Sequence, residues 1–133
     1  MNSRDKGKRG ELEFAHKLQE YGYNTRRGQQ FSGKNGDADV VGLHGIHLEV
    51  KRVEKLNIEA AMEQSVRDAR QGEMPIVAHR KNGKPWLITM ELDDFMSLYK
   101  WSDWENARFC ARCGARLYDE AEYCEVCEGD LFG

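Results

Sequence analysis

The chain has 133 residues, of which 40% are hydrophobic and 32% are charged, and its formal net charge is −3. This composition is typical of one globular domain with a small appendage, and it excludes fibrous and disordered proteins. There is no apolar run long enough to cross a membrane, and the first ten residues are polar and basic, so we expect neither a membrane span nor a secretory signal. We therefore predict a cytoplasmic protein, in the host cytoplasm if the source is viral.

Charge is distributed unevenly along the chain. Residues 1–34 carry eight Lys or Arg and four acidic residues, whereas residues 108–133 carry three Arg and six acidic residues. A basic N-terminal stretch can face the phosphates of a nucleic acid, although a solvated helix surface would have the same composition.

The first part of the chain predicts one helix and three strands. Leu12, Ala15 and Leu18, with Phe14 close to the same face, recur at helical spacing and predict a buried helix face. In chain order we expect a helix at residues 4–21, a strand at 23–27 and a mobile glycine-rich loop at 28–36. Two strands at 39–43 and 46–53, joined by a turn, follow.

The next part predicts a helix, a hairpin and a further helix. Asn57 is a candidate N-cap, and Asn82-Gly83 favours a tight turn between two strands. We expect a helix at residues 58–70, two strands at 74–80 and 85–90, and a second helix at 91–101. This order of elements implies an α/β fold in which helices flank one mixed central sheet.

The composition changes near Asn106, where a cysteine-containing segment begins. We therefore predict a first domain at residues 1–105 and a small second domain at residues 106–133. Three tryptophans and Phe95 exceed what a small core needs, so we expect some of these side chains at a dimer interface or beside the second domain. The tryptophans are Trp86, Trp101 and Trp104.

Two carboxylates and a lysine lie on neighbouring predicted strands. In Glu49-Val50-Lys51, strand alternation points Glu49 and Lys51 to one face and Val50 to the other. If the strand that starts at Asp39 pairs with this one, the carboxylates of Asp39 and Glu49 approach each other and repel unless a cation joins them. Mg²⁺ or Mn²⁺ suits such oxygen ligands, so we predict a catalytic metal site formed by Asp39, Glu49 and the backbone carbonyl of Val50. Lys51 would orient or activate the attacking water.

Glu11 extends this acidic group. It shares a face of the predicted helix with Ala15 and Leu18, and a carboxylate beside an apolar face is unusual unless it has a partner. Asp37 competes with Asp39 as the ligand, and we favour Asp39 because it lies further into the strand. Alone, an E-x-K triplet is more often a solvated strand surface than a catalytic site. The four histidines are interpreted as structural or surface residues, although His47 would share a face with Glu49.

Four cysteines form two knuckles, Cys110-x-x-Cys113 and Cys124-x-x-Cys127. Each knuckle brings two thiolates together, and two knuckles complete a tetrahedral zinc site with Zn–S distances of about 2.3 Å. The alternatives are an iron site with the same ligands and a redox dithiol pair. A closed four-cysteine site is structural, so we predict a zinc ribbon whose purpose is DNA contact, dimerisation or binding of a protein partner.

Three motifs in this order resemble those of the archaeal-type Holliday junction resolvases and their phage relatives, within the PD-(D/E)XK nuclease superfamily. The motifs are Arg9–Glu13, Gly36–Val41 and Leu48–Lys51, and the resemblance covers about residues 4–100. It implies a restriction-endonuclease-like core in residues 1–105, metal ligands at Glu11, Asp39 and Glu49, and a catalytic Lys51. It also suggests functional roles for Ser32 in the glycine-rich loop and for Gln64 in the helix after the lysine strand. An exposed helix glutamine is the alternative for Gln64.

The resemblance implies a Mg²⁺-dependent endonuclease of DNA recombination or repair that resolves four-way junctions by paired incisions. Such a junction is nearly two-fold symmetric, so we expect a homodimer. The alternatives are another restriction-like or repair nuclease of the same fold, and a non-catalytic zinc-ribbon adaptor that binds DNA.

Overall fold

The computed structural model describes residues 3–29, 38–102, 104, 107–117 and 122–130. Ser32 and Asp37 lie outside these residues, as does most of the predicted glycine-rich loop. The chain divides into two compact units, Met1–Leu92 and Asp93–Gly133, and each is described by itself. The predicted domain boundary at residues 105 and 106 stays a prediction, because compactness alone does not show where a chain folds independently.

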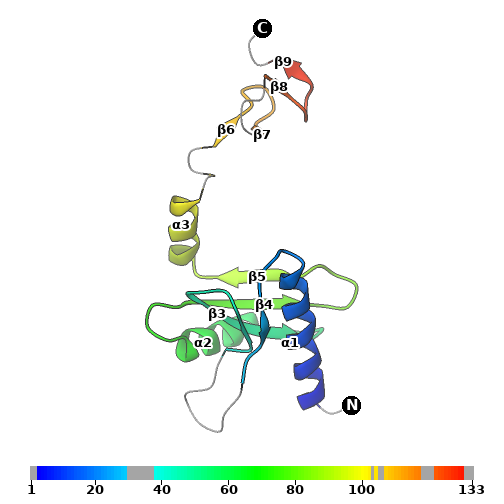
Figure 1. The fold of residues 1–133 in the computed structure, drawn as a ribbon, viewed down its shortest axis with the longest axis vertical. Coiled ribbons are helices and arrows are strands. Elements are labelled where there is room, and N and C mark those ends of the chain that lie inside the picture. The colour runs from blue at the N-terminus through cyan, green and yellow to red at the C-terminus, as the bar shows by residue number, and fades with distance from the viewer. Residues whose placement is uncertain (1–2, 30–37, 103, 105–106, 118–121, 131–133) are drawn as a thin grey trace. The chain divides into compact units, whose positions relative to one another are not determined.

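The first unit is a mixed five-stranded sheet with two helices, in the predicted order of elements (Figure 1). Its elements are α1 (Ser3–Gln19), β1 (Arg26–Arg27), β2 (Val40–Val41), β3 (Ile46–Arg52), α2 (Ile58–Asp68), β4 (Met74–Arg80) and β5 (Leu87–Met90). The spatial order is β1-β2-β3-β4-β5; β3 and β4 are parallel, and the other neighbours are antiparallel. The predicted strand at residues 23–27 is therefore correct in place but pairs over two residues.

The core lies between α1 and one face of the sheet. Phe14 and Ala15 pack there with Val40, Leu48 and Val50. Leu12, which we predicted on the buried face of the helix, is 43% exposed, so that prediction is wrong. The buried stripe instead follows positions 11, 14, 15 and 18, the i, i+3, i+4, i+7 spacing of one helix face, and this spacing puts Glu11 at the end of the stripe.

Alternation along β3 sends the intervening residues to the opposite face of the sheet. His47 and Glu49 point there, and Val77 of β4 is the register partner of Glu49. Helix α2 is attached to this part of the sheet by Ser65, whose hydroxyl donates to the carbonyl oxygen of Ile76 at 3.1 Å. The predicted N-cap of α2 is confirmed, since Asn57 Oδ1 accepts a hydrogen bond from the backbone N–H of Ala60 at 3.1 Å.

Trp86 belongs to the core of the first unit. Its ring packs against that of Phe14, with 4.8 Å between centroids. This contact accounts for one of the three tryptophans that we considered for an interface.

The second unit contains α3 (Leu92–Trp101, which starts at the unit boundary) and two short hairpins. The hairpins pair β6 (Arg108–Phe109) with β7 (Arg116–Leu117), and β8 (Tyr123–Cys124) with β9 (Gly129–Asp130). Cys110, Leu117 and Cys124 form a small buried cluster. Across the parts of both units that the structure describes, no helix has the length and apolar character needed to cross a membrane.

The close approach of α1 to β3 depends on a glycine. A Cβ added at Gly10 would lie 2.6 Å from the Cβ of Arg52, whereas one added at Gly7 would meet nothing within 4 Å. We therefore expect Gly10→Ala to lower the free energy of unfolding by about 1–3 kcal/mol through overpacking. Gly7→Ala, in the same helix, should raise it by about 0.5–1 kcal/mol because alanine loses less backbone entropy. Urea denaturation of the two variants checks this contrast, and equal effects would contradict it.

Candidate active site

The pairing of β2 with β3 brings two carboxyl groups together. Val40 faces Leu48 across the ladder, which places Asp39 beside the middle of β3. Asp39 Oδ2 accepts a hydrogen bond from the backbone N–H of Val50 at 2.8 Å, and the side chains of Asp39 and Glu49 are hydrogen-bonded to each other. Glu49 is only 4% exposed. The predicted approach of the two carboxyl groups is therefore present in the structure.

Because the two carboxyl groups are close together, their pKa values shift in opposite directions. Burial and the negative charge of Glu49 raise the pKa of Asp39 to about 8, although the hydrogen bond from Val50 opposes this shift. Burial also disfavours charge on Glu49, but hydrogen bonds with His47 and Asp39 outweigh it and lower the pKa of Glu49. At neutral pH and without a cation, the pair therefore holds one proton, located mainly on Asp39.

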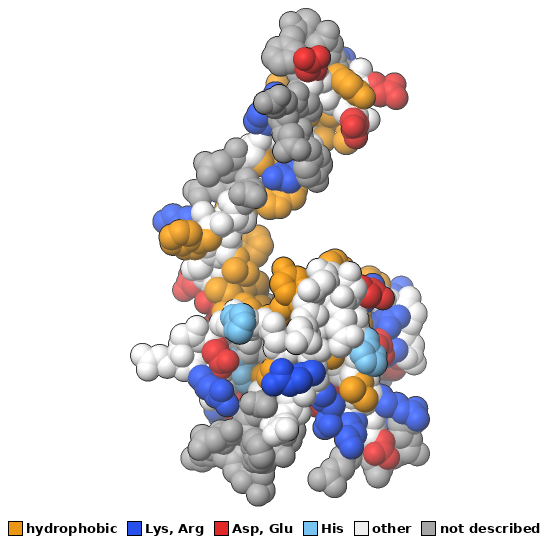
Figure 2. All heavy atoms as spheres, viewed as in Figure 1, with side chains coloured by type: hydrophobic (Ala, Val, Ile, Leu, Met, Phe, Trp, Pro, Cys, Tyr) orange, Lys and Arg blue, Asp and Glu red, His pale blue; other side chains and the backbone are white. Residues whose placement is uncertain are grey.

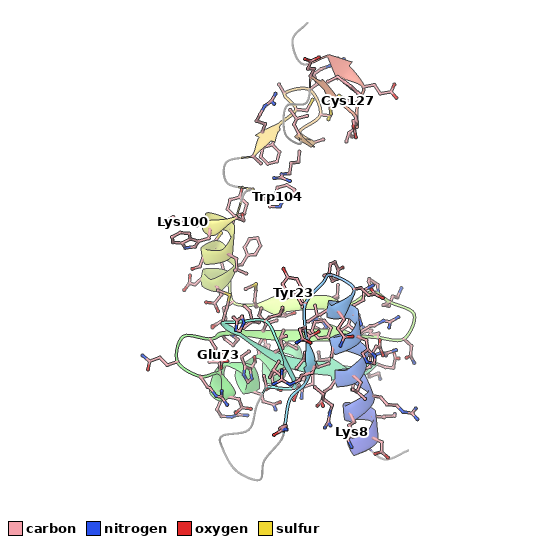
Figure 3. All side chains as sticks on the ribbon, in the orientation of Figure 1. Lys8, Tyr23, Glu73, Lys100, Trp104 and Cys127 are labelled. Atoms are coloured by element: carbon pink, nitrogen blue, oxygen red, sulfur yellow. The ribbon has the colours of Figure 1, made fainter. Side chains whose placement is uncertain are left out.

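His47 is the third member of this buried group. It is 3% exposed, and its Nε2 lies 2.8 Å from Glu49 Oε1. Its Nδ1 lies 3.9 Å from an oxygen of Glu73, in the turn between α2 and β4 (Figure 3). Burial opposes charge on the ring, but the hydrogen bond and charge of Glu49 raise the pKa of His47. The sequence placed His47 on the same strand face as Glu49 through their i, i+2 spacing, but we interpreted it as a structural or surface residue and did not predict this contact.

Lys51 and Gln64 meet next to the acidic pair. Lys51 Nζ donates to Gln64 Oε1 at 3.1 Å, which links the end of β3 to α2. The positive charge of Lys51 is one of the influences that lower the pKa of Glu49. The structure thus gathers Asp39, Glu49, Lys51 and Gln64 into one group, and Gln64 is half-buried and hydrogen-bonded rather than an exposed helix residue.

Glu11 lies at the margin of this group. Its charge contributes to raising the pKa of Asp39, but its Oε2 pairs with Arg27 Nε at 2.5 Å. Among the described residues, the cysteines form the group of possible metal ligands that lie close together, and Glu11, Asp39 and Glu49 do not form such a group. For the backbone of Val50, the structure shows the N–H held by Asp39, and the role of its carbonyl stays a prediction.

The donor set nevertheless fits a divalent cation. A buried carboxyl group and a half-buried one at short range are costly unless a proton or a cation lies between them. The raised pKa of Asp39 favours a proton in that place. A cation that displaces the proton would leave both carboxylates ionised and satisfied. Asp39 and Glu49 are therefore the residues best placed to hold a metal ion.

The cysteines form a second candidate metal centre. All four Sγ atoms lie within 4.8 Å of one another, with Cys110–Cys127 at 3.8 Å and Cys113–Cys124 at 3.6 Å. A tetrahedral site with metal–sulfur bonds of about 2.3 Å requires sulfur–sulfur distances of about 3.8 Å, so the spacing fits one metal ion. The backbone N–H groups of Cys113 and Arg112 lower the pKa of the Cys110 thiol to about 6, which favours the metal-binding thiolate.

The chain is similar to a known protein family and to a solved structure. The family described as "Phage putative PDDEXK endonuclease" matches residues 2–130. No curated protein shows a significant sequence match. One solved structure that aligns is that of Archaeoglobus fulgidus Hjc, a Holliday junction resolvase from an archaeal hyperthermophile, with 26% identity over 64% of this chain and 72% of that chain and a TM-score of 0.48.

The raised pKa of Asp39 predicts a pH-dependent stability. Because it lies above the ordinary value of 3.8, the folded chain keeps a proton on Asp39 between about pH 4 and pH 8 that the unfolded chain has lost. The resulting stabilisation is complete below pH 4 and disappears as the pH rises through 8. In the presence of a chelator, the free energy of unfolding of Asp39→Asn, which carries no charge at this position, should therefore rise relative to that of wild type by about 2–4 kcal/mol as the pH is raised from 5 to 9.

Urea denaturation at several pH values measures this difference directly. If the free energy of unfolding changes with pH in the same way in wild type and in Asp39→Asn, the proton shared by Asp39 and Glu49 is contradicted.

Proposed function

This chain belongs to the phage PDDEXK endonuclease family, and we propose that it is a Mg²⁺- or Mn²⁺-dependent DNA endonuclease that resolves four-way junctions by paired incisions. The family itself consists of nucleases that depend on a divalent metal ion. The observation that carries the proposal is the close pair of half-buried Asp39 and buried Glu49, with Lys51 and Gln64 hydrogen-bonded to each other beside it.

The chemistry follows from the positions of these side chains. A bound divalent ion would lower the pKa of a water molecule and offset charge on the scissile phosphate. Asp39 and Glu49 would hold that ion, with Glu11 and the Val50 carbonyl completing the proposed ligand set. The Lys51 ammonium group would orient the attacking water and stabilise the negative charge that develops on the phosphate. Gln64 would hold Lys51 Nζ in place through its 3.1 Å hydrogen bond, and Ser32, outside the described residues, completes the proposed catalytic group.

A basic hollow beside α1 supports DNA as the substrate. Lys and Arg side chains gather over this part of the first unit (Figure 2). The hollow has a volume of about 450 Å³, and its charged lining residues are Lys6, Arg9, Arg52, Glu13 and Glu54. Arg52 pairs with Glu13 at 3.3 Å, so Lys6 and Arg9 are the cations best placed for DNA. Lys6 and Arg9 are exposed, which suits contacts to successive phosphates of a DNA backbone.

The choice of a four-way junction rests on the resemblance of the three sequence motifs to junction resolvases. Two matched cuts on a nearly two-fold symmetric substrate require two active sites, and we therefore propose a symmetric homodimer.

Replacement of Lys51 tests the catalytic assignment. We expect Lys51→Ala to reduce cleavage about 100-fold or more while DNA binding persists, because the charge acts mainly in the transition state. Lys55→Ala is the matched control, since Lys55 is an exposed lysine four residues further on. Cleavage of labelled DNA with Mg²⁺ measures both variants. Wild-type activity in Lys51→Ala would remove Lys51 from the mechanism.

A panel of DNA substrates tests the junction assignment separately. Purified protein with Mg²⁺ should introduce paired nicks into a synthetic four-way junction and leave linear duplex and a flap largely uncut. Equal cutting of all three would reject the junction preference and leave a nuclease of broader specificity.

For the second centre we propose a structural zinc ion. One zinc per chain is expected by elemental analysis, and Cys113→Ser should lose it and unfold the surrounding hairpins, because metal binding supplies the folding energy of such small units. Ala111→Ser, in the same knuckle, should keep the metal. Iron in place of zinc, or full zinc content in Cys113→Ser, would count against this site.

A further inference from the structure

The buried contact between His47 and Glu49 is not required by the motif that defines the active site. Glu49 has two carboxylate oxygens, and the imidazole Nε2 lies 2.8 Å from Oε1. This contact leaves Oε2 as the oxygen without that partner. Both residues project from the same face of β3, two positions apart, and their side chains are 4% and 5% exposed. At this depth water does not compete for the hydrogen bond, so it restrains the rotation of the carboxylate.

We propose that His47 is a positioning residue for the metal centre, whose Nε2–H holds Oε1 of Glu49 and so presents Oε2 to a cation shared with Asp39. This inference rests on the proposed function. In this arrangement Glu49 would coordinate the cation through one oxygen. The hydrogen bond from His47 would orient the Glu49 carboxylate before the ion binds. Hydrogen-bond partners of metal ligands commonly change metal affinity about 10- to 100-fold when they are removed.

The surroundings of His47 fix its ring. Its Nδ1 faces Glu73 at 3.9 Å, too far for a hydrogen bond but close enough for the charge of the carboxylate to act on the ring. Glu73 is itself held, because its Oε1 accepts a hydrogen bond from the backbone N–H of Arg70 at 2.7 Å. The imidazole therefore lies between two carboxylates, one from its own strand and one from the turn before β4. This arrangement points Nε2 at Glu49.

Substitutions at His47 separate positioning from simple packing. His47→Leu keeps the bulk but removes the donor, whereas His47→Gln carries an amide N–H that can reach the place of Nε2. The matched control is His79→Leu. His79 is a partly buried histidine on β4 whose Nε2 also makes one hydrogen bond, to Thr89 Oγ1 at 2.8 Å.

The main readout is Mg²⁺ binding to the full chain by calorimetry, which requires no cleavage. We expect His47→Leu to weaken Mg²⁺ binding about 10- to 100-fold and His47→Gln to recover most of the loss. The KM for DNA should stay unchanged, while the Mg²⁺ concentration needed for half-maximal cleavage rises. His79→Leu should lower stability without any effect on Mg²⁺ binding.

Several outcomes would overturn the inference. These are equal Mg²⁺ affinity in wild type and His47→Leu, the same loss in His79→Leu, or no recovery in His47→Gln. If His47→Leu fails to fold, His47→Asn replaces it, because its shorter amide cannot reach Glu49; equal affinities for the Asn and Gln variants then contradict positioning. A wild-type chain that neither binds Mg²⁺ nor cleaves DNA would instead overturn the proposed function. Mg²⁺ binding that does not depend on His47 would overturn this inference alone.

Discussion

The repulsion between a buried carboxyl group and a half-buried one beside it is the constraint on which the site in the first unit depends. The antiparallel pairing of β2 with β3 brings Asp39, which is half-buried, close to Glu49, which is buried. Such an arrangement is unfavourable unless a positive charge or a proton lies between the groups. The pKa of Asp39 is raised and that of Glu49 is lowered, so one of the two groups holds a proton and the repulsion between two negative charges is avoided.

Contacts with the surrounding elements keep the two carboxyl groups close together. The backbone N–H of Val50 and the ring of His47 each take one oxygen of the pair, so neither carboxyl group can turn away freely. Helix α2 contributes Gln64, which keeps Lys51 beside Glu49. Helix α1 approaches β3 closely at Gly10 and delivers Glu11 to the margin of the site, where Arg27 holds it. These contacts oppose any rearrangement of the chain that would separate the two carboxyl groups.

Much of this fold could be predicted from the sequence because its signals are local. Strand alternation placed Glu49 and Lys51 on one face, the Asn57 cap and the Asn82-Gly83 turn marked element ends, and the two cysteine knuckles indicated a metal site. The error at Leu12 arose from choosing one of two overlapping apolar stripes, a choice that only the packing of α1 against the sheet decides.

The contacts that could not be predicted join residues far apart in the chain. Nothing in the local sequence indicates that Arg27 holds Glu11, or that Glu73 faces the ring of His47. His47 differs, because its spacing to Glu49 did indicate a shared face. A histidine is so often a satisfied core residue, however, that spacing alone does not indicate a role.

The most direct test of the account is the release of protons when Mg²⁺ binds to the metal-free active site at pH 7. If the ion replaces the proton that Asp39 and Glu49 share, each ion bound should release about one proton, and Asp39→Asn should release none. Calorimetry in buffers of different ionisation enthalpy counts these protons without any need for cleavage. Binding of Mg²⁺ with no proton release, or the same release from Asp39→Asn, would contradict the central claim that this pair is the metal site.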